Sequence, residues 1–213
     1  IRTAVRVRLA RNERESFQLA LRPPSGRRLS DVTFHVEDLV HESGNARIPA
    51  ENISIHNVLY YPVRVPSHFE GPTGDCPDAL PPYKPFSAPG GQTTPVWFTL
   101  YAPPGIPAGL YKGKLEMEAV ETSPFEFWIE AEVYDFDLPA TPALKTDFGF
   151  WPEGAYQWAR QLGYKGSPES VSAAYLQNAF EHRVTLREGC QLPAESPDYA
   201  ASLRQFEARL DDL

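Results

Sequence analysis

The side chains best suited to bind a metal or to act as a nucleophile are widely separated in this chain. The two cysteines, Cys76 and Cys190, form no CxxC pair, and no serine lies in a nucleophile-elbow sequence. The five histidines also follow no metal-ligand spacing: His35, His41, His56, His68 and His182. The sequence therefore predicts no metal site and no cofactor, and it favours two free thiols over a disulfide.

Charge and hydropathy exclude two classes of partner. The chain of 213 residues has a formal net charge of -8, and its charges are dispersed without a basic patch. A nucleic-acid partner is therefore not expected. No apolar run approaches the roughly 20 residues that a membrane span needs, so no membrane span is expected either.

Residues 1–138 show the alternation of β-strands. In AVRVRLA, Val5, Val7 and Leu9 alternate with arginines, which is the period of two of a half-buried strand. Similar alternation recurs in SFQLALRP, VTFHVEDLV, ISIHNVLYYPVRV, TPVWFTLYA, GLYKGKLEMEA and FEFWIEAEVYDF. About seven strands joined by Gly, Pro, Asn and Asp turns, with no helical period between them, predict an antiparallel β-sandwich.

Proline and glycine mark the corner between two of these strands. Pro103, Pro104 and Pro107 cannot donate to a strand ladder, so the first strand is predicted to end at Ala102. Gly105 and Gly109 supply the backbone freedom of a turn. The segment 94–119 is therefore predicted to be a hairpin.

A proline-rich segment runs from Pro62 to Pro95. Loops of this length are uncommon in a compact domain and are often functional, and proline restricts their freedom. Two roles are open: a scaffold loop that packs against a neighbouring domain, which we favour, or a loop that lines a binding cleft.

The pattern changes after residue 138. Pro139 and Pro142 indicate a linker over 139–145. Beyond it, KTDFGF and RVTL resemble buried strands, and the segments that begin Ser-Pro-acid at Ser167 and Ser196 are typical of helices. The order strand, helix, strand, helix predicts the start of an α/β domain with parallel strands.

This second part is too short to be complete. A closed (β/α)₈ barrel has about 250 residues, and 146–213 supplies far fewer. A finished two-strand subdomain is disfavoured, because parallel strands are covered on both faces. We therefore expect the chain to be part of a longer protein.

Several phrases resemble the amino-terminal region of family 123 glycoside hydrolases and their uncharacterised relatives. They are ARNERESFQLALRP, GDCPDALPP, PVWFTLYAPPGIPAGLYKGKLEM and VYDFDLPATPALKTDFGF. The most specific are P-x-G-x-P-A-G-x-Y-x-G, from Pro103 to Gly113, and D-F-x-L-P, from Asp135 to Pro139. The resemblance implies a mainly β chain with an accessory β-sandwich over 1–138, a linker over 139–145, and the first βαβα portion of a truncated (β/α)₈ catalytic barrel over 146–213.

The resemblance also implies a chemistry and a setting. The family hydrolyses β-linked N-acetylgalactosamine: the acetamide oxygen of the substrate attacks the anomeric carbon, and an adjacent Asp-Glu pair assists. No Asp-Glu dipeptide occurs in this sequence, and Glu37-Asp38 has the reverse order. No catalytic residue is therefore assigned here, and the fragment alone is expected to be inactive. The implied partner is a glycan substrate of the full-length, bacterial protein, and the implied location is extracellular or periplasmic.

Two residues are candidates for substrate binding by barrel geometry. Barrel active sites lie at the carboxyl ends of the strands. If TDFGF and RVTL are the first two strands, Trp151 and Arg187 follow their ends. Trp151 would stack on a sugar face and Arg187 would meet a hydroxyl or acidic group. The alternatives are a Trp151 that packs against the sandwich and a solvated Arg187.

A second function is open, in which the sandwich itself is a carbohydrate-binding or adhesion module. Its candidate residues are the aromatic side chains Trp97, Tyr101 and Trp128. Trp97 and Tyr101 alternate with Phe98 and Leu100, so they lie on the other face of their strand. Packing against the barrel is the competing role for these aromatics, and we favour it.

Overall fold

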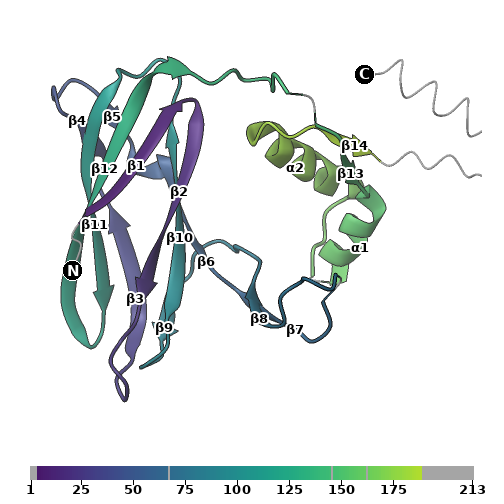
Figure 1. The fold of residues 1–213 in the computed structure, drawn as a ribbon, viewed down its shortest axis with the longest axis horizontal. Helices are drawn as coiled ribbons and strands as arrows, with labels where there is room; N and C mark the ends of the chain where they lie inside the picture. Colours follow the sequence, from purple (N-terminus) through teal and green to yellow (C-terminus); the bar gives the residue numbers. More distant parts are fainter. Residues whose placement is uncertain (1–3, 67, 145, 162, 189–213) are drawn as a thin grey trace, which may run out of the picture. The chain divides into compact units, whose positions relative to one another are not determined.

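The computed structural model describes residues 4–66, 68–144, 146–161 and 163–188. By its internal contacts the chain divides into two units, Ile1–Leu138 and Pro139–Leu213. The fold is mainly β, as predicted, and the two α-helices described lie in the second unit (Figure 1).

Unit 1 contains two principal sheets. The larger sheet has the order β1-β12-β11-β3-β9, with β4 paired to β11 and β5 paired to β4. Its strands are β1 Ala4–Arg11, β3 Leu29–Val36, β4 Leu39–His41, β5 Arg47–Ile48, β9 Phe86–Ala88, β11 Gly109–Ala119 and β12 Thr122–Asp137. The smaller sheet has the order β2-β10-β6. Its strands are β2 Glu13–Leu21, β6 Ile53–Asn57, which follows the short 3-10 helix η1 Ala50–Asn52, and β10 Thr94–Ala102.

The two sheets share one hydrophobic core. Leu9, Tyr111 and Ile129 from the larger sheet and Phe98 and Leu100 from the smaller one are fully buried in a single cluster. Every second residue of β10 is buried, which is the predicted alternation. Two sheets packed face to face over a common core are the arrangement expected of a sandwich.

The prediction that all strands are antiparallel is wrong for β1. This strand pairs with β12 in parallel, with Val5 opposite Ile129 and Val7 opposite Ala131. The chain does not make a hairpin after β1. Instead, Asn12, which has a φ of 58°, precedes β2 in the other sheet. Because β1 is free of its sequence neighbour, it pairs with the last strand of the unit.

The segment ISIHNVLYYPVRV is not one strand. It divides into β6 and β7 Tyr60–Val63, and β7 forms a separate hairpin with β8 Gly74–Pro77. Likewise, VTFHVEDLV divides into β3 and β4. β10 ends at Ala102, as the prolines predicted, and β11 begins at Gly109.

Unit 2 contains a small parallel sheet and two helices. Its elements are β13 Phe148–Phe150, α1 Pro152–Gln161, α2 Pro168–Glu181 and β14 Leu186–Glu188. β13 pairs with β14 in parallel, as the strand-helix-strand order predicted. α2 begins where expected, since the Ser167 hydroxyl accepts a hydrogen bond from the Ser170 N–H. The second predicted helix, from Ser196, lies outside the described residues, as does Cys190, and Cys76 is a free thiol.

Candidate functional site

The βα loop of unit 2 joins β13 to α2 and carries α1. Because β13 and β14 are parallel and α2 connects them, the amino end of α2 lies toward the carboxyl end of β13. The ring of Tyr175 in α2 stacks on Phe150 at 5.0 Å between centroids, so α2 covers one face of this small sheet. The loop therefore lies at the strand end where α/β proteins place their ligands.

Trp151 is the first residue after β13. Its side chain is 68% exposed, while its carbonyl accepts a 3.0 Å hydrogen bond from the Ala155 N–H in the first turn of α1. Gly154 is buried beneath it. A Cβ added at Gly154 would lie 2.7 Å from the ring atoms Cδ2 and Cζ3 and closer still to Cε3. The indole thus rests on the backbone of Gly154.

Arg187 is not positioned as its candidate role required. It lies within β14, opposite Gly149, because the strand begins at Leu186 and extends beyond the RVTL segment. Its side chain is outside the part of the chain that the structure describes. The role in substrate binding remains a prediction.

The amino end of α2 has its own hydrogen-bond network. The Ser170 hydroxyl donates to the Ser167 carbonyl at 2.7 Å and lies 2.6 Å from the Tyr164 hydroxyl. A hydrogen bond from the Ser167 side chain lowers the pKa of Glu169. The Ser167 hydroxyl also accepts a hydrogen bond from the Ser170 N–H, one of the free N–H groups of the first turn, and these contacts account for the serines as a helix cap.

The carboxyl groups with a shifted pKa differ from what a glycosidase acid requires. A general acid that acts near neutral pH needs a raised pKa. The pKa of Glu121 is lowered by the Ser30 hydroxyl and N–H, and that of Glu130 by Arg6 and Lys112. Together with Glu169, they remain ionised, so none of these three carboxyl groups is suited to donate a proton.

A hollow of about 870 Å³ in unit 1 is lined by residues of β1, β2, β11 and β12. Its charged side chains pair across strands: Arg6 Nε lies 2.7 Å from Glu130, Lys112 Nζ lies 3.3 Å from the same carboxylate, and Arg8 Nε lies 2.8 Å from Glu132. Because the cations are already paired with carboxylates of the sheet, this hollow is a poor site for an anionic ligand.

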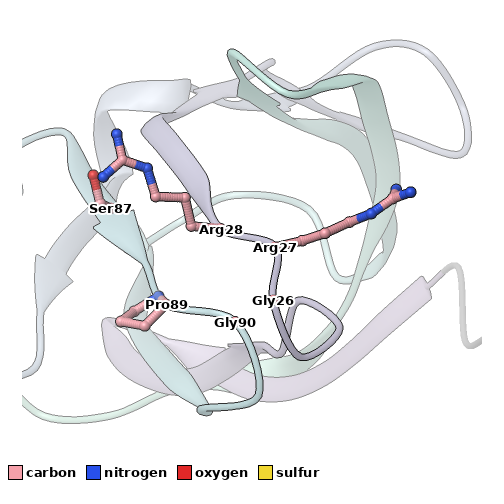
Figure 2. Close-up of a pocket in the computed structure, with 6 residues that line it drawn as sticks. All are labelled: Gly26, Arg27, Arg28, Ser87, Pro89 and Gly90. Carbon is pink, nitrogen blue, oxygen red and sulfur yellow. The ribbon is translucent and has the colours of Figure 1, made fainter.

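A smaller hollow of about 430 Å³ lies between the Gly26–Arg28 turn and the residues around Pro89. Figure 2 shows the Arg28 side chain directed toward Ser87 and the Arg27 side chain directed away from it. The two guanidinium groups therefore do not converge on one point. The turn is held by close backbone packing, since a Cβ at Gly90 would lie 2.6 Å from the Pro24 carbonyl oxygen.

The three aromatic candidates of the sandwich have different surroundings. Trp97 is half-buried and its indole N–H donates to the Thr99 hydroxyl at 3.2 Å. Tyr101 is also half-buried, and its hydroxyl donates to Asn12 Oδ1 at 3.0 Å. Trp128 is 42% exposed, with Lys114 Nζ 5.7 Å from its ring centroid. Trp128 is thus the most accessible of the three.

The described residues of the proline-rich segment contain β8 and β9. At the tip of the β7–β8 hairpin, Val65 and Phe69 are 84% and 86% exposed. Near its base, the Tyr83 hydroxyl donates a 2.5 Å hydrogen bond to the Val32 carbonyl in β3. The segment is therefore anchored at Tyr83 and presents apolar side chains at its tip. Its two alternative roles remain predictions.

Unit 2 also has an apolar groove of about 400 Å³ between α2 and β14. Leu176 and Phe180 line it and are 41% and 51% exposed. The buried residues of that helix are Val171 and Ala179. The described part of unit 2 leaves much of the groove-lining face of α2 open.

Other residue classes supply no further site in the described ranges. These contain no group of three or more His, Cys, Asp and Glu residues placed to hold a metal ion. His182 caps α2, with Nδ1 2.7 Å from the Asn178 carbonyl oxygen. Among the helices described, none has the length and apolar character of a membrane span.

Neither α1 nor the contact between Gly154 and the indole was predicted from the sequence. The signal for the helix was present: Pro152 stands at its start and Glu153 lies in its first turn, as in the Ser-Pro-Glu start of α2. Contact between Gly154 and the indole had no comparable signal, because an isolated glycine within a helical pattern has several explanations.

Comparison with protein families gives a match over residues 3–119 to the model described as Glycoside hydrolase 123 N-terminal domain. Comparison with curated proteins gave no match. Among solved structures, the chain is similar to a family 123 glycoside hydrolase from Clostridium perfringens, analysed for glycolipid glycan hydrolysis, with a TM-score of 0.68 and 18% identity. The alignment covers 85% of this chain and 32% of that one, so the chain spans about a third of its length.

Two further solved structures align more weakly. The periplasmic chaperone SfaE aligns with a TM-score of 0.35 and 12% identity, over 69% of this chain and 64% of that chain. The ASH / PapD-like domain of human CEP192 aligns with a TM-score of 0.31 and 14% identity, over 64% and 84% of the two chains. These scores are too low to indicate a common fold.

Proposed function

Because the chain belongs to the family of glycoside hydrolase 123 N-terminal domains, we propose that it is the amino-terminal part of a glycoside hydrolase. In this proposal residues 1–138 are a scaffold sandwich, 139–145 a linker, and 146–213 the start of a (β/α)₈ catalytic domain. The whole enzyme hydrolyses β-linked N-acetylgalactosamine with the help of the substrate's acetamide. The catalytic Asp-Glu pair lies on a later barrel strand, outside this sequence.

The observation that carries the proposal is the family match over residues 3–119. The βαβ order of β13, α2 and β14 is in keeping with it, since a (β/α)₈ barrel is built from such units. The exposed apolar side chains of α2 agree with it too, because parallel sheets and their helices are covered on both faces in complete domains. The lowered pKa of Glu121, Glu130 and Glu169 is consistent with a general acid located elsewhere in the enzyme.

The test compares the full-length protein with the 213-residue chain. A chromogenic β-N-acetylgalactosaminide is expected to be hydrolysed by the full-length protein and not by the chain. The matching β-galactoside, which lacks the acetamide, is expected to resist hydrolysis, because the attacking oxygen is absent. Hydrolysis of both sugars at equal rates would refute the acetamide mechanism, and hydrolysis of neither would refute the enzymatic assignment.

Exposed Trp128 favours one second candidate, a carbohydrate-binding role for the sandwich. Large aromatic side chains with a polar neighbour are common in binding surfaces, and Lys114 lies next to this ring. Calorimetric titration of the chain with N-acetylgalactosaminides tests the idea. Binding that Trp128→Ala abolishes and Val120→Ala preserves would support it, because Val120 is an exposed apolar residue of the same unit. Absence of binding by the chain supports the scaffold.

A further inference from the structure

We propose that Gly154 is a positioning residue, which lets the indole of Trp151 lie flat on α1 as a fixed platform for a sugar ring at the carboxyl end of β13. This inference rests on the proposed function, since it names a substrate contact of the same catalytic domain. It goes beyond that function by assigning a role to a residue without a side chain.

Space is what the glycine provides at this position. Gly154 lies in the first turn of α1, and its φ is outside the left-handed range that favours glycine. Glycine is also a weaker helix former than alanine. The backbone therefore has no conformational need for glycine here, and alanine would favour the helix. The indole is the obstacle, because an added Cβ would lie 2.7 Å from both Cδ2 and Cζ3.

The contact leaves the indole available to a ligand. Gly154 is buried, whereas Trp151 is 68% exposed, so one side of the ring is covered by backbone and much of the remainder is open. A binding site needs side chains whose rotamers are locked by packing, and the backbone of Gly154 provides such packing for this indole. A pyranose of galacto configuration has C–H groups gathered on one face, and this apolar face is complementary to an indole.

A second aromatic of the same loop, Tyr164, lies against a glycine with the hydroxyl end of its ring. A Cβ at Gly166 would lie 2.7 Å from Tyr164 Cε1, and the Tyr164 hydroxyl is 2.6 Å from the Ser170 hydroxyl. Tyr164 is accounted for by this helix-cap contact. Trp151 has no comparable polar anchor among its described contacts, so only the backbone and Gly154 fix it.

Trp158 is the matched control for Trp151. It lies on the same helix and is 66% exposed, but for no described glycine is its ring among the atoms nearest to an added Cβ. Substitution of Trp158 tests whether any exposed tryptophan of α1 affects the reaction. Substitution of Gly154 tests whether the position of the Trp151 indole affects the reaction.

The experiment measures steady-state hydrolysis by the full-length protein with Gly154→Ala, Trp151→Ala, the double substitution and Trp158→Ala. Gly154→Ala and Trp151→Ala are each expected to raise KM about three- to tenfold with kcat changed less than about twofold, as for the loss of one stacking contact. In the Trp151→Ala background, Gly154→Ala is expected to have no further effect, because the residue acts through the indole. Trp158→Ala is expected to leave KM unchanged.

Two outcomes would overturn the inference while the proposed function stands: an unchanged KM in Gly154→Ala, or an equal rise in KM with and without Trp151. An inactive wild-type protein would instead refute the proposed function. The platform is then tested by titration with N-acetylgalactosamine followed by tryptophan fluorescence. A saturable change that is lost in Trp151→Ala and in Gly154→Ala supports the platform, and no change in the wild type refutes it.

Discussion

The two units of this chain differ in what they do with their large apolar side chains. In unit 1, Phe98 and Tyr111 are fully buried between two sheets. In unit 2, Trp151 and Phe180 are 68% and 51% exposed. Buried apolar area is the main source of folding free energy, so unit 1 stabilises itself. The described part of unit 2 buries fewer apolar side chains, among them Phe150, Val171 and Ala179.

The difference between the units is tested most directly by replacing one phenylalanine with alanine in each unit. Phe98→Ala removes a ring that stacks on Phe17 at 5.0 Å and meets Phe34 at 5.4 Å. We expect it to lower the free energy of unfolding by about 3–5 kcal/mol, since a cavity is left in the core. Phe180→Ala, at a half-exposed position of α2, is expected to cost less than about 1 kcal/mol. Urea unfolding of the chain, followed by circular dichroism, measures both.

Equal losses of unfolding free energy in Phe98→Ala and Phe180→Ala would contradict the difference between the two units. They would mean either that unit 1 has no self-sufficient core or that unit 2 buries Phe180 in solution. A change of the urea dependence without a change of midpoint would indicate an altered denatured state instead. Val120→Ala, at a position 72% exposed in unit 1, shows the effect expected of a surface substitution in the same unit.

A smaller effect is expected at the hairpin corner that closes one end of unit 1. Gly109 has a φ of 137°, and a Cβ there would lie less than 3.0 Å from His41 Nε2. That ring nitrogen donates to the Ala108 carbonyl at 3.1 Å, and the His41 ring contacts Tyr111 at 4.8 Å. Gly109→Ala therefore strains the backbone and displaces a buried histidine. We expect a loss of about 2–3 kcal/mol of unfolding free energy, measured by urea denaturation.

Gly105 is the matched control for this corner. Its φ is 74° and an added Cβ would meet nothing within 4 Å, so Gly105→Ala introduces backbone strain without a clash. We expect a loss of about 1 kcal/mol. If Gly105→Ala and Gly109→Ala lower the free energy of unfolding equally, the contact with His41 contributes nothing to stability, and backbone conformation alone holds the corner.

These elements also show which features the sequence could predict. The alternation of apolar and polar residues correctly identified strands such as β10, because Val96, Phe98 and Leu100 face one core. Local chemistry was equally informative: prolines ended β10 at Ala102, and Ser167 capped α2. Each of these signals involves residues within a few positions of one another.

The features that the sequence did not predict depend on distant partners. A period of two says which face of β1 is buried but not which strand lies beside it, so its parallel pairing with β12 was missed. Two strand boundaries also depend on the neighbouring strand. They are the break between β6, which pairs with β10, and β7, which pairs with β8, and the start of β14 at Leu186 beside β13. In the candidate site, Trp151 was identified by its place after an apolar run. The contact that holds its indole was visible only in three dimensions.

The last prediction concerns the hydrogen bond that joins the proline-rich segment to β3 of unit 1. The Tyr83 hydroxyl donates to the Val32 carbonyl, and burial raises the pKa of Tyr83 from 10.0 to about 12. The folded state therefore keeps the phenol protonated at pH values where the unfolded chain loses the proton. The resulting stability is complete below pH 10 and is lost as the pH rises toward 12.

Tyr83→Phe removes the hydrogen bond and the titration together. Below pH 10 the variant is expected to be less stable by about 0.5–1.5 kcal/mol, because the Val32 carbonyl loses its donor. The difference in unfolding free energy should narrow as the pH rises from 10 to 12, since only the wild type then loses stability through Tyr83.

Burial also raises the pKa of Tyr111, and subtraction of the two stability profiles removes that shared contribution. Thermal unfolding at intervals of pH measures both curves, with Tyr60→Phe, at a tyrosine 47% exposed, as the control. Parallel curves for the wild type and Tyr83→Phe across this range would show that burial does not raise the pKa of Tyr83. Coincident curves would show that the hydroxyl contributes no stability, and the segment would then be held by the packing of Tyr83 against Phe34 and Phe86.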